Sequence, residues 1–208
     1  MIKKLYLDVE TTGLDSKKCG LTQVAYIIEI DGNVMATGNM DVRPFEGAQI
    51  TAKALEVTGK TYEEIMQYPL DEEQFKIFRA VLKTYINPMV YGDDFTLIAY
   101  NAEFDQNYLI EWFDRNGVKY SNYINYRKVD TLAILRILHA EGFANLKGYK
   151  LTEVYKAVFD EEFDAHDALA DIEATKRLHE FLVENYLTSP DERKRLINQK
   201  PHTEDMGK

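Results

Sequence analysis

The chain has 208 residues, of which 45% are hydrophobic and 29% charged, a balance that excludes a disordered protein and favours one globular domain. The formal net charge of −10 argues against nucleic-acid binding through a broad basic surface. No apolar run approaches the ~20 residues of a bilayer span, the start lacks a signal-peptide pattern and Cys19 is the lone cysteine, so we predict a cytoplasmic protein outside the membrane.

The first half of the chain predicts a strand, a hairpin and a helix. Residues 3–8 form a short apolar run that is typical of a strand. Residues 23–30 and 34–42 flank the turn signal Asp31-Gly32, which predicts a hairpin. Apolar residues recur at three- and four-residue steps over residues 71–86, and this period indicates an amphipathic helix.

In the second half, strand and helix patterns alternate. Residues 96–100 predict a buried strand, and residues 104–115 predict a helix that ends at Asn116-Gly117. Three further helices are predicted over residues 131–141, 151–158 and 167–186. Strands that are followed by alternating strands and helices indicate an α/β or α+β domain with a mixed sheet.

The last twenty residues differ in character from the rest. Residues 189–208 carry almost no apolar side chains, which predicts a solvated C-terminal tail after a domain of residues 1–188. A frayed terminus is one interpretation of this tail, and a tether or partner-binding segment is the other.

Two acidic residues of the first strand are predicted to share one face. Asp8 and Glu10 lie two residues apart, and strand side chains alternate between faces. Like charges placed together favour a cation between them or protonation of one. The alternative is a strand end that frays into solvent, where the repulsion is screened.

Two further aspartates fall on the apolar sides of predicted helices. Asp171 lies seven residues before Leu178, and Asp105 lies four residues before Leu109. A buried acidic residue is costly unless it is paired or bound to metal. A helix-dipole or capping role is the alternative, and it explains Asp167 better than Asp171. Four carboxylates with oxygen-only donors predict Mg²⁺ or Mn²⁺ rather than Zn²⁺.

His166 precedes the last predicted helix. It lies five residues before Asp171, a spacing that does not place it on the same face as that carboxylate. We therefore interpret His166 as a general base rather than a metal ligand, because an imidazole pKa near neutrality suits proton abstraction from water. A surface or satisfied histidine is the alternative, and we predict that role for His139 and His179.

Three segments resemble the motifs of a nuclease family. Asp8-Val-Glu-Thr-Thr-Gly-Leu14, Tyr100-Asn-Ala-Glu-Phe-Asp105 and His166-Asp-Ala-Leu-Ala-Asp171 resemble the three exonuclease motifs of the DEDDh family, the DnaQ-like 3′–5′ exonucleases. Residues 57–61 resemble the short family segment that lines the substrate cleft. Tyr100 departs from the histidine that is frequent at this position in the family, which puts substrate preference in more doubt than activity.

The resemblance implies an RNase H-like fold, with a mixed five-stranded sheet flanked by helices. It also implies a metal-dependent 3′–5′ exonuclease that releases nucleoside monophosphates from single-stranded DNA ends, of the proofreading, repair or phage-replication type. Asp8, Glu10, Asp105 and Asp171 would hold two Mg²⁺ or Mn²⁺ ions. His166 would be the general base.

The resemblance further implies a substrate pocket and partners. The substrate-binding residues would be Thr11, Thr12, Leu14, Thr58, Asn101 and Phe104. The implied partners are a single-stranded DNA 3′ end and a polymerase or replication protein, as for the epsilon subunit of DNA polymerase III. Two alternatives stay open: a 3′–5′ exoribonuclease of the same superfamily, and a non-catalytic module recruited through the C-terminal tail.

Overall fold

The computed structural model describes residues 1–142, 144, 146–165 and 167–187, and within them the strands form one mixed sheet. The strand order is β3-β2-β1-β4-β5. β1 pairs antiparallel with β2 and parallel with β4, while β3 and β5 form the edges. The strands are β1 (Lys3–Thr11), β2 (Leu21–Ile30), β3 (Asn33–Asp41), β4 (Thr96–Ala99) and β5 (Val129–Asp130). The expected five-stranded sheet is confirmed.

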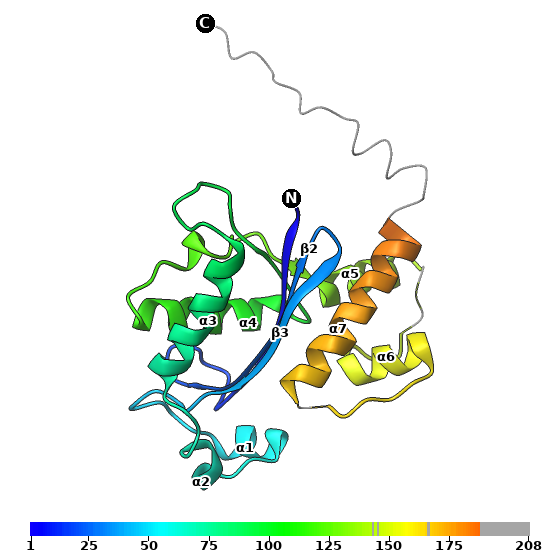
Figure 1. The fold of residues 1–208 in the computed structure, drawn as a ribbon. Helices are drawn as coiled ribbons and strands as arrows, with labels where there is room; N and C mark the ends of the chain where they lie inside the picture. Colours follow the sequence, from blue (N-terminus) through cyan, green and yellow to red (C-terminus); the bar gives the residue numbers. More distant parts are fainter. Residues whose placement is uncertain (143, 145, 166, 188–208) are drawn as a thin grey trace, which may run out of the picture.

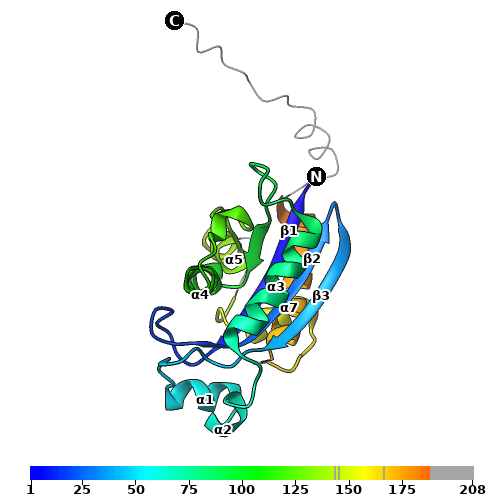
Figure 2. The ribbon, with the colours of Figure 1, turned by 60° about the vertical axis from the view of Figure 1, so that its left-hand side comes forward.

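Helices cover both faces of this sheet, and α3 and α7 lie on opposite faces (Figure 1, Figure 2). α1 and α2 lie beyond the end of the sheet at which β1 finishes. The helices are α1 (Ala52–Thr58), α2 (Tyr62–Ile65), α3 (Asp71–Tyr85), α4 (Ala102–Arg115), α5 (Thr131–Ala140), α6 (Leu151–Phe159) and α7 (Ala168–Leu182), with a 3₁₀ turn η1 (Tyr120–Asn122) and a π-helical turn η2 (Val183–Leu187). Among the described residues, no helix is both long enough and apolar enough to cross a membrane.

β1 directs alternate side chains into two separate cores. Leu7 is fully buried in the larger core, which also contains the aromatic side chains of α3 and α4. Tyr6 points to the opposite face and packs in a second cluster with Ile172 of α7. Because side chains alternate along a strand, Asp8 and Glu10 share the face of Tyr6. β1 therefore presents both carboxylates on the face that α7 covers.

The predicted elements are confirmed, with changes at their ends. β1 continues to Thr11, so that Asp8 and Glu10 lie inside the strand, opposite Ala25 and Gln23 of β2. The alternative in which this strand end frays into solvent is therefore wrong. The helix expected over residues 104–115 begins two residues earlier, and the last helix changes from α to π geometry after residue 182.

The hydrophobic pattern does not predict α1, α2 or β5. α1 buries no side chain, so it carries no apolar stripe. α2 has four residues and β5 has two, which is too short for any periodic signal. The expected tail, residues 189–208, lies outside the described part of the chain.

Candidate active site

Three of the predicted metal ligands meet where β1 passes the start of α7. Asp8 and Glu10 come from β1, and Asp171 comes from the first turn of α7. One carboxylate oxygen from each residue lies within 4.8 Å of the other two, and all three side chains are half-buried. Carboxylates at this spacing are placed to share a divalent cation.

Asp105 reaches the same place from α4. Its side chain is buried, and its Oδ1 accepts a hydrogen bond from the backbone N–H of Val9, at 3.2 Å. Val9 stands between Asp8 and Glu10, so this hydrogen bond ties α4 directly to the acidic part of β1. Asp105 is outside the close group of three, but its negative charge raises the pKa of Asp8. The structure thus brings all four predicted carboxylates to one site.

Burial and mutual repulsion raise the pKa values of these carboxyl groups. Burial is the largest cause for Asp8, whose pKa lies well above its usual range, and the charge of Asp105 is the next. Burial also raises the pKa of Asp105. For Glu10, burial followed by the charges of Asp171 and Asp167 raises the pKa to about 8. At neutral pH the site therefore favours protons or cations over four bare carboxylates.

The donor set fits a hard divalent cation. The four side chains offer only carboxylate oxygens, which suit Mg²⁺ and Mn²⁺ better than Zn²⁺. A bound cation would replace the protons that burial and repulsion otherwise favour. The residues present therefore fit the metal ions that the sequence predicts.

Two further aspartates beside the cluster are helix caps. Asp167 accepts hydrogen bonds from the backbone N–H groups of Leu169 and Ala170, both at 3.1 Å, which confirms its predicted capping role. Asp130 caps α5 by accepting from the N–H of Leu132 at 3.0 Å. Asp130 is not among the residues predicted from the sequence, although an Asp directly before an apolar helical run is an N-cap signal.

A cavity of about 590 Å³ opens on one side of the carboxylates. It is bordered by Glu10 and lined by four of the predicted substrate-binding residues: Thr11, Leu14, Thr58 and Phe104. The Leu14 side chain is 88% exposed and offers an apolar surface at the rim. The Thr11 hydroxyl donates to the Gly13 carbonyl at 2.7 Å, and so does the Tyr108 hydroxyl at 2.7 Å, so this loop is held from two sides.

The other two predicted substrate-binding residues, Thr12 and Asn101, are not part of the cavity wall. Thr12 is fully buried, and its hydroxyl donates to the Gln49 carbonyl at 2.6 Å and accepts from the Gly20 N–H at 2.8 Å. Asn101 begins α4 with a φ of 65°, and its N–H donates to Asp130 at 3.0 Å. Both residues hold loops that carry the site, and contact of either with substrate stays a prediction.

A second cavity, of about 550 Å³, lies against Asp8 and Asp171. Ala165, the residue before His166, is part of its wall, whereas His166 itself lies outside the described residues. The other described residues of the wall are Val57, Tyr100, Lys150, Leu151 and Thr152. Since Glu10 borders the first cavity, the carboxylate cluster lies between the two.

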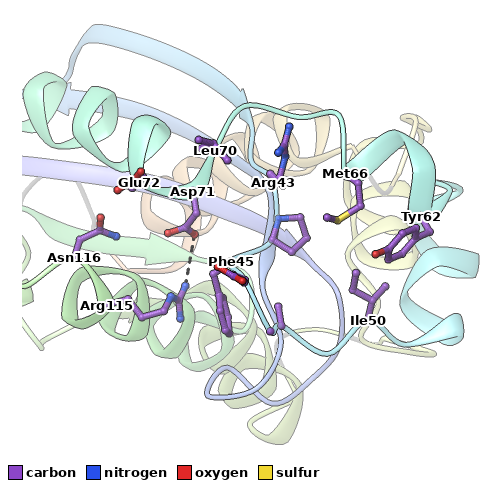
Figure 3. Close-up of a pocket in the computed structure, with 14 residues that line it drawn as sticks. Arg43, Phe45, Ile50, Tyr62, Met66, Leu70, Asp71, Glu72, Arg115 and Asn116 are labelled. Atoms are coloured by element: carbon purple, nitrogen blue, oxygen red, sulfur yellow. Dashed lines mark ion pairs between the residues drawn. The ribbon is translucent and has the colours of Figure 1, made fainter.

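A third cavity, of about 640 Å³, is separate from the carboxylates (Figure 3). The Arg115 guanidinium lies 4.2 Å from the centre of the Phe45 ring, and its Nη2 is 3.7 Å from Oδ1 of Asp71. This pair joins the end of α4 to the start of α3. None of the predicted site residues lines this cavity.

Comparison with known proteins places this arrangement in a family. Residues 5–179 match the family RNase_T, which is described as exonuclease. Ribonuclease T of Haemophilus influenzae is 27% identical over 184 residues, which cover 85% of this chain and 77% of the relative. The PolC-type DNA polymerase III of Bacillus cereus is 28% identical over 168 residues, which cover 81% of this chain and 10% of the polymerase.

The fold is also found in a solved structure. Escherichia coli exonuclease I in complex with a dT13 oligonucleotide superposes with a TM-score of 0.74 and 21% sequence identity. The superposition covers 95% of this chain and 44% of exonuclease I, so the chain spans less than half of that protein. The sheet, the site geometry and the match over residues 5–179 agree: the chain belongs to the exonuclease family of DnaQ-like 3′–5′ exonucleases, which have an RNase H-like fold.

Proposed function

We propose that this exonuclease-family hydrolase releases nucleoside monophosphates, one at a time, from the 3′ end of single-stranded DNA. The observation that carries the proposal is the carboxylate cluster between two cavities. The first cavity has room for one terminal nucleotide, and the cluster lies at its edge, where the last phosphodiester would lie. A cavity of this size suits one terminal nucleotide, which supports action at chain ends.

The four carboxylates supply the chemistry of the site through bound cations. Asp8, Glu10, Asp105 and Asp171 would hold two Mg²⁺ or Mn²⁺ ions, which stabilise charge on the attacking and leaving oxygens of a phosphodiester. The hydrogen bond from the Val9 N–H orients Asp105 for this role. The same cations let an acidic chain accept an anionic substrate, which reconciles the net charge of −10 with nucleic acid.

The apolar part of the first cavity would hold the terminal nucleoside. The Phe104 ring packs at a tilt of 50° against Tyr108, with 5.0 Å between ring centres, and Leu14 lies at the rim of the same cavity. A base placed between them gains stacking energy of about 1–3 kcal/mol. This contact carries no sequence code, since every base has an aromatic face.

His166 is proposed to take the proton from the attacking water. Its neighbour Ala165 lines the cavity that Asp8 and Asp171 border, which supports this role. In the His166→Ala variant, kcat is expected to fall by a factor of about 10²–10⁴, the usual contribution of a general base. Isothermal titration with Mn²⁺ should show unchanged metal affinity. A variant that no longer binds Mn²⁺ would instead make His166 a ligand.

DNA and RNA are the two candidate substrate classes. We favour DNA because the Thr11-Thr12 pair resembles the DNA-acting members of the family. RNA is the second candidate, because ribonuclease T matches over 77% of its own length whereas the match to the polymerase covers 10% of that protein. The test is a pair of oligonucleotides with the same sequence in DNA and RNA.

The strand polarity can be tested with the same oligonucleotides. A 5′-labelled single strand should give a descending ladder, and a 3′-labelled one should release labelled mononucleotide at once. Paired ends should react more slowly than mismatched ends, because unpairing costs a few kcal/mol. Faster cleavage of RNA would select the exoribonuclease, and efficient cleavage of circular single-stranded DNA would contradict an end-directed site.

The remaining assignments concern regions outside the site. We propose a catalytic domain of residues 1–188 and a separate tail of residues 189–208, which the melting temperatures of the full and shortened chains would test. Family membership favours an enzyme over a non-catalytic module recruited through that tail. A polymerase partner and a cytoplasmic location stay predictions from the sequence; a pull-down from a cell extract would test the first and cell fractionation the second.

A further inference from the structure

The cavity beside Asp8 and Asp171 has one cationic residue in its described wall. That residue is Lys150, which is exposed. The lysines of the first cavity are both paired with carboxylates: Lys18 with Asp15 at 2.9 Å and Lys53 with Glu56 at 3.0 Å. The Lys150 ammonium group forms no ion pair or hydrogen bond with another described residue, and only its backbone carbonyl is bonded, by the N–H of Val154 at 3.0 Å. Its ammonium group is therefore available to a ligand in the cavity.

The backbone that carries Lys150 is fixed in place. Lys150 is the N-cap residue of α6, with an extended backbone, and α6 lies beside α7 (Figure 1). The preceding carbonyl, of Tyr149, accepts a hydrogen bond of 2.6 Å from the Tyr100 hydroxyl. Tyr100 follows β4 directly and lines the same cavity. This hydrogen bond thus joins the start of α6 to the end of β4, the strand beside β1.

The charges of the site favour one more positive group near the substrate phosphate. Four carboxylates would balance two divalent ions, so the negative charge of a substrate phosphate would need a further cation. Lys60, whose charge acts on Glu10, does not line this cavity. No side chain caps the first turn of α6, and its first two residues, Leu151 and Thr152, line the cavity beside Lys150. The positive end of the helix dipole, offset in part by Glu153 in the first turn, adds to the field of the ammonium group.

We propose that Lys150 binds the scissile phosphate, which becomes the 5′-phosphate of the released nucleotide, and that Tyr100 is a positioning residue that holds the Lys150 backbone through Tyr149. The inference rests on the proposed function, since it names a further phosphate contact of that site. Tyr100 also stands where histidine is frequent in the family that the sequence resembles. The Tyr100 hydroxyl holds the segment that contains Lys150 through its hydrogen bond to the Tyr149 carbonyl.

Product binding tests this contact without requiring turnover. Isothermal titration in Mn²⁺ would compare thymidine 5′-monophosphate with thymidine, and uridine 5′-monophosphate with uridine. In Lys150→Gln, affinity for both monophosphates should fall about tenfold, as expected for a lost charge-assisted contact. Affinity for the nucleosides should not change. Lys150→Arg should recover most of the loss, because it keeps the charge.

Two further variants separate a phosphate contact from general effects. Lys147→Gln removes an exposed charge three residues away that is not in the cavity wall, and it should leave monophosphate affinity unchanged. Tyr100→Phe removes the hydrogen bond to Tyr149 and should weaken monophosphate binding by about threefold, with nucleoside binding unchanged.

The outcomes distinguish this inference from the proposed function. A wild-type chain that cleaves no oligonucleotide contradicts the proposed function. A wild-type chain that cleaves, with Lys150→Gln equal to it in monophosphate affinity, contradicts the Lys150 contact alone. An equal loss for monophosphate and nucleoside would show that Lys150 only supports the fold of the cavity, and the contact would then be withdrawn.

Discussion

Cleavage by the Asp8→Asn variant is expected to fall at least about a thousandfold, because losing a bound cation removes several kcal/mol of transition-state stabilisation. Asp8 contributes an oxygen to the close group with Glu10 and Asp171, and it borders the cavity in which the phosphate would lie. EDTA should abolish cleavage by the unmodified chain, and Mg²⁺ or Mn²⁺ should restore it. The measurement is the initial rate on a 5′-labelled oligonucleotide.

The fold of the Asp8→Asn variant should stay intact. In EDTA its melting temperature should equal or exceed that of the unmodified chain, because the substitution removes a half-buried acidic group whose neighbours repel it. Asp114→Asn is the matched control, since Asp114 is exposed on α4 away from the cluster. Full activity in EDTA, or in Asp8→Asn, would contradict the metal-ion mechanism.

The sequence predicts the carboxylate cluster well because the position of each carboxylate follows from the side-chain repeat of one strand or one helix. Asp8 and Glu10 share a face through strand alternation, and β1 keeps that alternation through both residues. Asp105 follows from helical spacing to the buried Leu109, and the structure buries both. Short-range geometry therefore places each carboxylate correctly on its own element.

Features that depend on distant contacts could not be predicted in the same way. Thr12 lies in a segment that resembles a family motif, and the resemblance implies contact with substrate. Its hydroxyl instead donates to the Gln49 carbonyl and accepts from the Gly20 N–H. No local pattern indicates that these residues meet. The hydrogen bond between Tyr100 and the Tyr149 carbonyl likewise spans 49 positions in the chain. Contacts of this kind can be identified only when the order of the strands in the sheet is known.

Some missed elements did leave signals other than periodicity. α1 is preceded by Thr51, whose side chain caps it, and is followed by Gly59 with a φ of 67°. α2 starts with a capping box between Thr61 and Glu64. Both are recognised signals for a helix start or end. Capping residues would have located both short helices, of which α1 lines part of the first cavity.

In EDTA, the Glu10→Gln variant is expected to become more stable than the unmodified chain as pH rises. Burial and the charge of Asp171 raise the pKa of Glu10 to about 8 in the folded state, against 4.5 for the free group. The unfolded chain therefore loses this proton at lower pH than the folded chain does. Folding stability that depends on the proton is present below pH 4.5 and is lost as pH rises to about 8.

Glutamine does not titrate, so the difference in free energy of unfolding between the variant and the unmodified chain should change with pH over a defined range. The difference should be constant below pH 4.5 and should increase in favour of Glu10→Gln up to about pH 8, by on the order of 4 kcal/mol. Urea denaturation in EDTA at half-unit pH steps measures it. Glu173→Gln, an exposed position on α7, is the control and should show no such change.

Adding Mn²⁺ should make the unmodified chain more stable than Glu10→Gln at pH 8, because the cation stabilises the carboxylate that the variant lacks. A difference that does not change with pH would mean that Glu10 ionises freely in the folded chain, and the acidic cluster would then not require a cation to form.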